Sequence, residues 1–242
     1  MSAATAVAYG RFSPRRGGWR VDSWWGKAFL RAVEECAGDE AQLTAARALA
    51  RSGRIGGLII DAGSLVASVE DPNAPLSSGE SGLFSVRVDL PILDADARGA
   101  LLEVLASSPL RVQGLLDGTM AHDLVEYAEE AGAELIPYGD ELVAVCTCRH
   151  WQETCVHALG VLYQAGWLVD GDPLVLFHLR GVPRADVVAA GRAGDEPAPA
   201  EGPTPAAPAL DDVEIAVDAA LRAQALLDGM SDGDRQVNPA ER

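Results

Sequence analysis

The spacing of apolar residues along the chain predicts a mixture of strands and helices. In residues 83–90 apolar and polar side chains alternate, as in a strand with one buried face. Apolar runs predict two more strands at 57–61 and 64–70, joined by a tight turn. Apolar residues at helical spacing predict helices that begin after the N-cap Ser23 and that cover residues 40–51, 94–106, 110–116 and 120–131.

The second half of the chain shows the same mixture. Residues 133–136 and 142–148 are predicted strands on either side of a turn, and an apolar helix follows at about residues 155–165. A further helix is expected to begin near Pro173, because proline suits the first helical turn. The sequence therefore predicts an α+β fold with a small mixed sheet and several helices.

Charge is distributed unevenly along the chain. The net charge is −17, yet residues 1–54 carry nine basic and five acidic side chains, a net charge of +4. Residues 55–184 carry −13 and residues 185–242 carry −8. An acidic protein repels nucleic acid at long range, so any contact with phosphate is expected through the N-terminal segment.

These patterns predict four segments. Residues 1–54 are a basic, aromatic loop followed by helices, residues 55–138 are an α/β core segment, and residues 139–184 contain a cysteine-rich window and the helices after it. Residues 185–242 are an acidic tail rich in alanine and proline, which is expected to be disordered. A short helix at 210–228 is expected within the tail, either solvated or docked on a partner or on its own domain.

The sequence predicts neither export nor a membrane span. Its apolar runs are too short to cross a bilayer, and residues 1–7 lack the parts of a secretory signal. Three of the four cysteines lie within ten residues, unlike a disulfide framework that ties distant segments together. We therefore expect a cytoplasmic protein in which Cys36 is a small buried residue.

Cys146, Cys148, Cys155 and His157 follow the pattern C-x-C-x6-C-x-H. Cysteines at positions i and i+2 of a strand point to the same side, so their thiolates can meet at one ion. Cys155 and His157 would lie about 200° apart in mid-helix, so they can meet only where a helix begins. Three sulfurs and one imidazole make a closed tetrahedral set that suits structural zinc and leaves no position for catalysis.

Other interpretations of this window stay open at this point. A Cys146–Cys148 disulfide would need a local bend, since residues i and i+2 of a strand are near the limit of bridging distance. His150 could compete as a ligand or lie beside the site. A Cys–His nucleophilic pair would need an orienting third residue and a pocket, and the sequence marks neither.

The window resembles the SWIM zinc finger, found in bacterial proteins, in Swi/Snf-type chromatin ATPases and in plant Mutator-type transposases. Trp151 in the loop and the apolar helix after His157 also match the family. The stretches YGRFSPRRG, SWWGKAFLRAVE and DPLVLFHLRG resemble actinobacterial SWIM-finger proteins, so the resemblance touches residues 9–181. His150 and Val156 depart from the family's usual acid and base, and the missing base weakens any case for phosphate binding by the finger itself. The resemblance implies a zinc-bound strand–loop–helix (SWIM) module near the C-terminal end of the domain.

Two classes of function follow. The first is a protein adaptor, with a Swi/Snf-type ATPase as the partner that the resemblance implies, because genes for the two often lie side by side in bacteria. The acidic body fits contact with protein better than contact with DNA. The alternative is direct binding of DNA or RNA through the zinc module and the basic candidates Arg11, Arg15, Arg16 and Arg20.

Aromatic residues near these arginines have two interpretations. Rings interleaved with cations can stack on bases. Trp24, Trp25 and Phe29 are instead expected to be core residues of a helix, since they lie at helical spacing.

The sequence carries no recognisable enzyme motif. It lacks a phosphate-binding loop, a nucleophile elbow, an H-E-x-x-H pair and a dinucleotide fingerprint. His122 and His178 stand alone in helical patterns and are interpreted as packing or surface residues, while Asp61 and Asp71 flank strands as turn formers. We therefore expect a non-enzymatic protein, and the sequence does not set its oligomeric state.

Overall fold

The computed structural model describes residues 6–17, 20–72, 82–148 and 154–195. The chain divides into two compact units, Met1–Glu196 and Pro197–Arg242, and all described residues belong to the first. The predictions for His150, Trp151 and the helix at 210–228 therefore lie outside the described residues.

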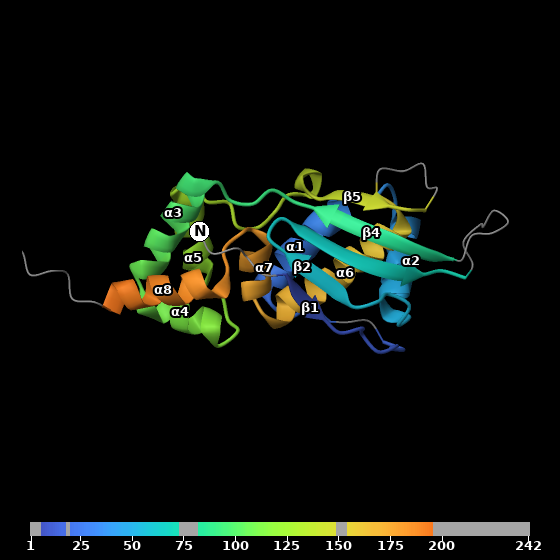
Figure 1. Ribbon diagram of the computed structural model, residues 1–242, viewed down its shortest axis with the longest axis horizontal. Helices are drawn as coiled ribbons and strands as arrows, with labels where there is room; N and C mark the ends of the chain where they lie inside the picture. Colours follow the sequence, from blue (N-terminus) through green and yellow to red (C-terminus); the bar gives the residue numbers. More distant parts are fainter. Residues whose placement is uncertain (1–5, 18–19, 73–81, 149–153, 196–242) are drawn as a thin grey trace, which may run out of the picture. The chain divides into compact units, whose positions relative to one another are not determined.

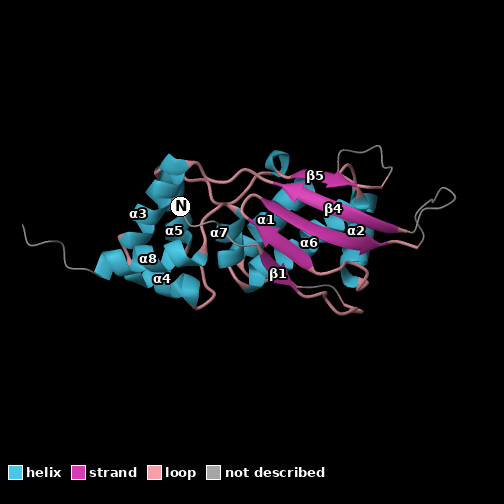
Figure 2. Ribbon diagram, in the orientation of Figure 1, coloured by secondary structure: helices cyan, strands magenta, loops and turns pink. Residues whose placement is uncertain are grey.

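Five strands form one sheet in which neighbours in space follow one another in sequence (Figures 1 and 2). They are β1 (Val7–Tyr9), β2 (Leu58–Asp61), β3 (Ser64–Glu70), β4 (Leu83–Asp89) and β5 (Val143–Cys146). Each pair of neighbours is antiparallel, so the expectation of a mixed sheet is wrong. The α+β class is confirmed, and four of the predicted strands are present with small changes of boundary.

Every second residue of the central strands is buried, as in a sheet that is covered on one side. Leu65, Ala67 and Val69 of β3 face the covered side, where Val88 of β4 pairs with Leu65. Cys146 of β5 pairs with Val86 and therefore shares this side. The opposite side, which we call the open sheet face, carries four exposed apolar residues: Ile59, Leu83, Val143 and Val145.

Three helices lie behind the sheet in Figure 1. They are α1 (Trp24–Glu35), α2 (Glu40–Arg51) and α6 (Val156–Gly171). α6 contacts α1, α2, β4 and β5, and its residues are buried on nearly all sides. A helix that is apolar all round is a core helix, so α6 is the centre around which this layer packs.

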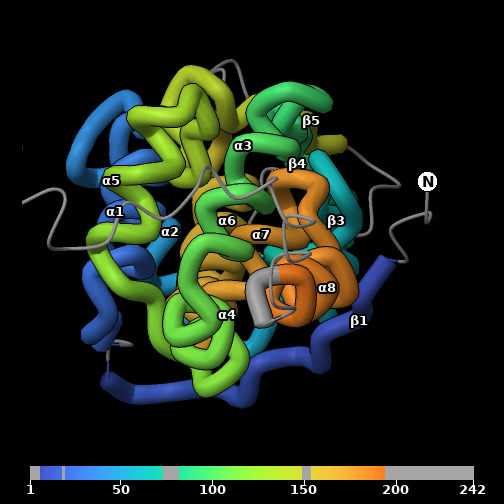
Figure 3. Tube along the Cα trace, turned by 90° about the vertical axis from the view of Figure 1, so that its left-hand side faces the viewer, coloured from blue at the N-terminus to red at the C-terminus, as the bar shows by residue number. Residues whose placement is uncertain are grey.

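A second group of helices packs beside the sheet layer. It consists of α3 (Ala95–Ala106), α4 (Pro109–Leu116), α5 (His122–Glu130) and α8 (Arg184–Asp195). α8 lies against α3 and α4 (Figure 3). The short α7 (Leu174–Leu179) connects the two groups through contacts with α6, β2 and α8.

The position of α8 corrects the expected start of the tail. Residues 184–195 are helical, although their composition predicts a disordered tail from residue 185. Val187 and Ala190 are buried, and Gly191 lies close to the side chain of Val112 on α4. Burial of this small apolar stripe is the physical reason that the segment is ordered as a helix.

Two strand predictions also need correction. Residues 133–136 alternate in burial like a strand but pair with none of the strands in the described part of the chain. The carbonyl of Glu134 instead accepts a hydrogen bond from the guanidinium of Arg180 at 2.7 Å. β1, which was not predicted, is a three-residue edge strand paired with β2.

None of the helices in the described residues has the length and apolar character needed to cross a membrane.

Candidate metal centre

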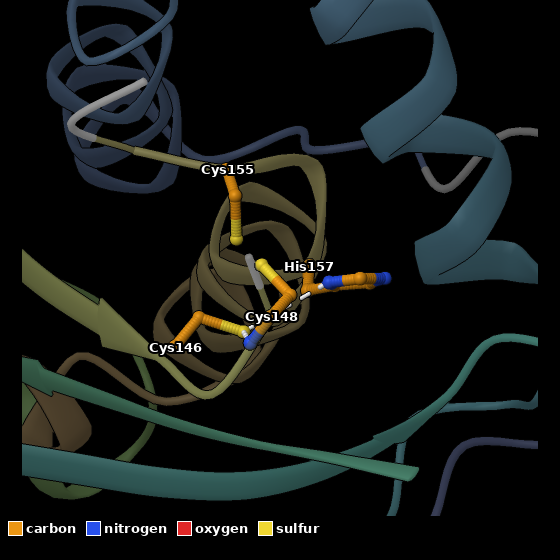
Figure 4. A group of neighbouring side chains, drawn as sticks. All are labelled: Cys146, Cys148, Cys155 and His157. Carbon is orange, nitrogen blue, oxygen red and sulfur yellow. Dashed lines mark hydrogen bonds between the residues drawn. The ribbon is translucent and has the colours of Figure 1, made fainter. Parts of the chain in front are cut away.

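Four side chains that could hold a metal ion come from the end of β5 and the start of α6. Cys146 is the last residue of β5, and Cys148 follows two residues later. Cys155 is the N-cap of α6, and His157 lies in its first turn. In Figure 4 the three sulfurs point toward one another beside the ring of His157.

The spacing of the donor atoms fits a tetrahedral ion. One ligand atom from each of the four residues lies within 4.8 Å of the others. The Sγ of Cys146 is 3.8 Å from Nδ1 of His157. Metal–sulfur bonds of about 2.3 Å at tetrahedral angles place two donors about 3.8 Å apart, so a small contraction of the group would complete the site.

The start of α6 brings Cys155 and His157 together, as the sequence predicts. Cys155 has an extended backbone with φ −86° and ψ 166°, so its side chain departs from the helical direction. Its sulfur accepts a hydrogen bond from the N–H of Ala158 at 3.5 Å. An N-terminal position also favours negative charge on the sulfur, because the unpaired N–H groups of the first turn point toward it.

A hydrogen bond joins the thiol groups of Cys146 and Cys155. The hydrogen bond between the two thiols lowers the pKa of Cys155, and His157 and the N–H of Ala158 lower it further. The same hydrogen bond, together with burial, raises the pKa of Cys146. The lowered pKa favours the thiolate form of Cys155, which is the form that binds a metal ion.

Burial and hydrogen bonding shift the pKa of His157 in opposite directions. Burial, the largest of them, lowers the pKa, but hydrogen bonds to Cys155 and Asp71 outweigh it and raise the pKa overall. Nε2 of His157 lies 3.2 Å from Oδ2 of Asp71, on the side away from the sulfurs. The ring also stacks on Phe84, with centroids 4.5 Å apart.

Asp71 and Phe84 are the neighbours of the site that sequence reasoning missed. Asp71 was interpreted as a turn former, and Phe84 as one residue of an alternating strand. No local pattern joins them to His157, which lies 86 residues after Asp71. Only the β3–β4 hairpin, with Phe84 paired to Val69, places them beside the start of α6.

The four basic candidates lie in different surroundings. Arg11 forms an ion pair with Glu70 at 2.8 Å, and Arg20 forms one with Asp22 at 3.1 Å. Arg15 and Arg16 are exposed in the loop after β1.

The structure also brings Arg51 and Arg54 to this loop, and sequence reasoning had not selected them. The backbone N–H of Arg15 donates to the carbonyl of Arg51 at 2.9 Å. The backbone N–H of Glu70 donates to the carbonyl of Arg54 at 2.9 Å. These contacts bring two arginine-bearing segments side by side, and we call their five arginines the arginine cluster: Arg11, Arg15, Arg16, Arg51 and Arg54.

The aromatic residues near these cations are engaged in packing. Phe29 and Trp25 are buried, and Nε1 of Trp24 donates to the carbonyl of Met120 at 2.9 Å. This confirms Trp25 and Phe29 as core residues, while Trp24 is partly buried and packs against the core. Phe12 packs edge-on against Trp167, so this ring too is committed to internal contacts.

Cys36, the fourth cysteine, and His122 make hydrogen-bond and packing contacts outside the Cys3His cluster. Burial, with the nearby charges of Glu35 and Asp140, raises the pKa of Cys36 to about 11. Its thiol donates to backbone carbonyls of Ala32 and Gly139. The ring of His122 stacks on Trp24 at 4.1 Å, as expected of a packing residue.

Fold and site together define an α+β protein with a Cys3His cluster that could hold a metal ion. The chain is 27% identical over 170 residues to the uncharacterized protein Rv2102 of Mycobacterium tuberculosis. That stretch is 70% of this chain and 58% of the relative, so the chain matches less than two thirds of the relative's length. No family model matches the chain. No solved structure matches it either.

Proposed function

We propose that this chain is a non-enzymatic adaptor of the SWIM-finger class, stabilised by zinc, that binds another protein. The observation that carries the proposal is the closed Cys3His donor set at the junction of β5 and α6. Three thiolates and an imidazole are soft and borderline donors of the kind zinc prefers, and four protein ligands leave no position for substrate. The C-x-C-x6-C-x-H pattern supports the SWIM class, and a cytoplasmic location would keep the thiols reduced.

The open sheet face supports a protein partner. Ile59 is 50% exposed and Val145 is 60% exposed, although both lie in the middle of ordered strands. Exposed apolar side chains gathered on one face are typical of protein–protein contact sites. The resemblance to SWIM-finger proteins indicates a Swi/Snf-type ATPase as the partner to test.

Two measurements test the adaptor proposal. Elemental analysis of purified full-length protein should find one zinc per chain. Calorimetric titration with a Swi/Snf-type ATPase of the same organism should give micromolar or tighter binding that weakens at least about tenfold in Ile59→Asp or Val145→Asp, since each buries a charge in the contact. Leu110→Asp, at an 83% exposed position on α4, is the matched control. Purified protein without metal would contradict the zinc site. An ATPase that does not bind would contradict the proposed partner.

Direct binding of nucleic acid is the second candidate, and the arginine cluster is the observation that favours it. Five arginines lie on two segments that are joined by backbone hydrogen bonds, in a chain whose net charge is −17. Arginine binds phosphate well because its planar fork matches two phosphate oxygens. Among the described residues, Phe12, Trp25 and Phe29 are engaged in packing and not in position to stack on bases, so we expect these arginines to contact the phosphate backbone.

Fluorescence anisotropy of labelled single- and double-stranded DNA, measured across salt concentrations, tests this candidate. Binding should weaken with salt and be lost in the Arg15→Ala/Arg16→Ala double variant. Arg51→Ala/Arg54→Ala should lower the salt slope by about one for each lost phosphate contact. Arg87→Ala, on β4 and outside the arginine cluster, is the control. An absence of binding at low salt would exclude this candidate and leave the adaptor.

A further inference from the structure

The two nitrogens of the His157 ring face different partners. Nδ1 lies 3.8 Å from the sulfur of Cys146, while Nε2 lies 3.2 Å from the carboxylate of Asp71. The side chain of His157 is 9% exposed and that of Asp71 is 27% exposed, so both are largely shielded from water. A neutral imidazole carries an N–H on one nitrogen and a lone pair on the other. The carboxylate of Asp71 favours the N–H on Nε2, which leaves the lone pair on Nδ1, the nitrogen that faces the sulfurs.

Both neighbours of the ring are held by the β3–β4 hairpin. Asp71 follows directly after β3, and its backbone N–H donates to the carbonyl of Gly82 at 2.8 Å. Phe84 belongs to β4 and stacks on the ring with an interplanar angle of 19°. The hairpin therefore supplies a fixed hydrogen-bond acceptor and a fixed flat surface for a histidine on α6.

We propose that Asp71 is a positioning residue of the metal centre, which accepts the Nε2 proton of His157 and thereby presents Nδ1 as the metal ligand. This inference rests on the proposed zinc site. A carboxylate that accepts from the second nitrogen of a ligating histidine sets the tautomer and ring orientation, and it makes the ligating nitrogen more basic. The metal module then extends beyond residues 139–184 to the β3–β4 hairpin.

The affinity of the full-length chain for Zn²⁺ is the first test. Loss of such a carboxylate lowers metal affinity by about 10–100-fold, so Asp71→Asn should show this decrease in competition with a chelator of known affinity. One zinc per chain should still bind at saturation. Asp71→Glu should recover part of the affinity, because it restores a carboxylate. Asp89→Asn, which removes a carboxylate paired with Arg87 on the neighbouring strand, is the matched control and should bind as the parent does.

Nitrogen-15 NMR of the zinc-loaded chain gives a readout that a general loss of stability would not imitate. The spectrum of His157 should show a metal-bound Nδ1 and a protonated Nε2, and the signal of that proton should shift in Asp71→Asn. Ligation through Nε2, or an Asp71→Asn affinity within twofold of the parent, would overturn the inference.

The outcomes separate this inference from the proposed zinc site. Failure of the parent chain to bind zinc would remove the site itself. If the parent binds zinc and His157→Ala loses it while Asp71→Asn keeps full affinity, the site stands and only the role of Asp71 is wrong.

Discussion

Cys155 combines two roles within one residue. Its backbone is the N-cap of α6, and its sulfur is one of the four clustered donor atoms. A helix N-terminus stabilises a thiolate, and a thiolate is the form that binds metal. Helix initiation and metal binding therefore depend on the same side chain.

We expect Cys155→Ala and His157→Ala each to lose the metal and to unfold at least residues 142–168. Structural zinc contributes roughly 10–16 kcal/mol in finger peptides, which is comparable to the net stability of about 5–15 kcal/mol of a whole domain. Metal analysis and circular dichroism measure both effects. Cys36→Ala, outside the cluster, should keep its zinc. Stoichiometric zinc in either ligand variant would show that the ligand assignment is wrong.

Arg180 is a buried cation that joins three segments. Its side chain is 4% exposed, and it donates to the carbonyls of Pro91 and Glu134 at 2.8 and 2.7 Å. The carboxylate of Glu141 lies 3.4 Å away. These bonds hold residues 133–136 in place where no strand ladder is formed.

Arg180→Met should lower the free energy of unfolding by about 2–4 kcal/mol, because it removes two hydrogen bonds of a buried guanidinium and the cation that faces Glu141. Urea unfolding of the zinc-loaded protein measures the change. Arg47→Met is the comparison, since Arg47 is 36% exposed and pairs with Glu34 and Glu40 at the surface. Its loss should cost less than about 1 kcal/mol. Equal effects of the two substitutions would argue against the special role of Arg180.

At the scale of elements, α1 and α6 are joined through the cap of α1. Oγ of Ser23 accepts from the N–H of Gly26 at 3.0 Å and donates to Asp170 of α6 at 2.7 Å. Asp170 also accepts from the backbone N–H of Ser23. The start of α1 is thus determined by its own cap and by contact with the core helix.

Ser23→Ala should therefore lower the free energy of unfolding by about 1–2 kcal/mol. Thermal and chemical unfolding would measure it. Ser108 occupies the same cap position of α4 but makes no side-chain capping bond. Ser108→Ala should change stability by less than about 0.5 kcal/mol, and a loss as large as that of Ser23→Ala would contradict this explanation.

At the scale of the whole described unit, the candidate metal centre lies where the sheet meets its covering helices. β5 and α6 supply the donors, while β3 and β4 supply Asp71 and Phe84. The helices α3, α4 and α8 pack on one another and donate nothing to this cluster. Removal of a metal should therefore affect the two groups of helices unequally.

Hydrogen exchange after treatment with a chelator tests this difference. Protection should fall first in β5 and the first turn of α6, because an ion bound by the four side chains would join these two segments. Peptides from α3 and α4 are the internal control and should exchange more slowly. Equal loss of protection in both groups would show that the metal stabilises the unit as a whole.

Much of the secondary structure could be predicted from local sequence. The bounds of α2 match the prediction, as does Ser23 as N-cap of α1, because caps and apolar spacing act within a few residues. The clustering of the four candidate ligands was predictable for the same reason. They lie within one short window, and the backbone directions of a strand end and a helix start bring them together.

Contacts between distant segments were decided only by the tertiary structure. Pairing of β1 with β2, the ordered α8 and the irregular path of residues 133–136 depend on which edge or apolar surface is available after the rest has packed. The same is true of Asp71 beside His157 and of Arg51 beside Arg15. A sequence pattern reports the periodicity of its own segment, whereas these contacts depend on partners far along the chain that become neighbours only in the folded protein.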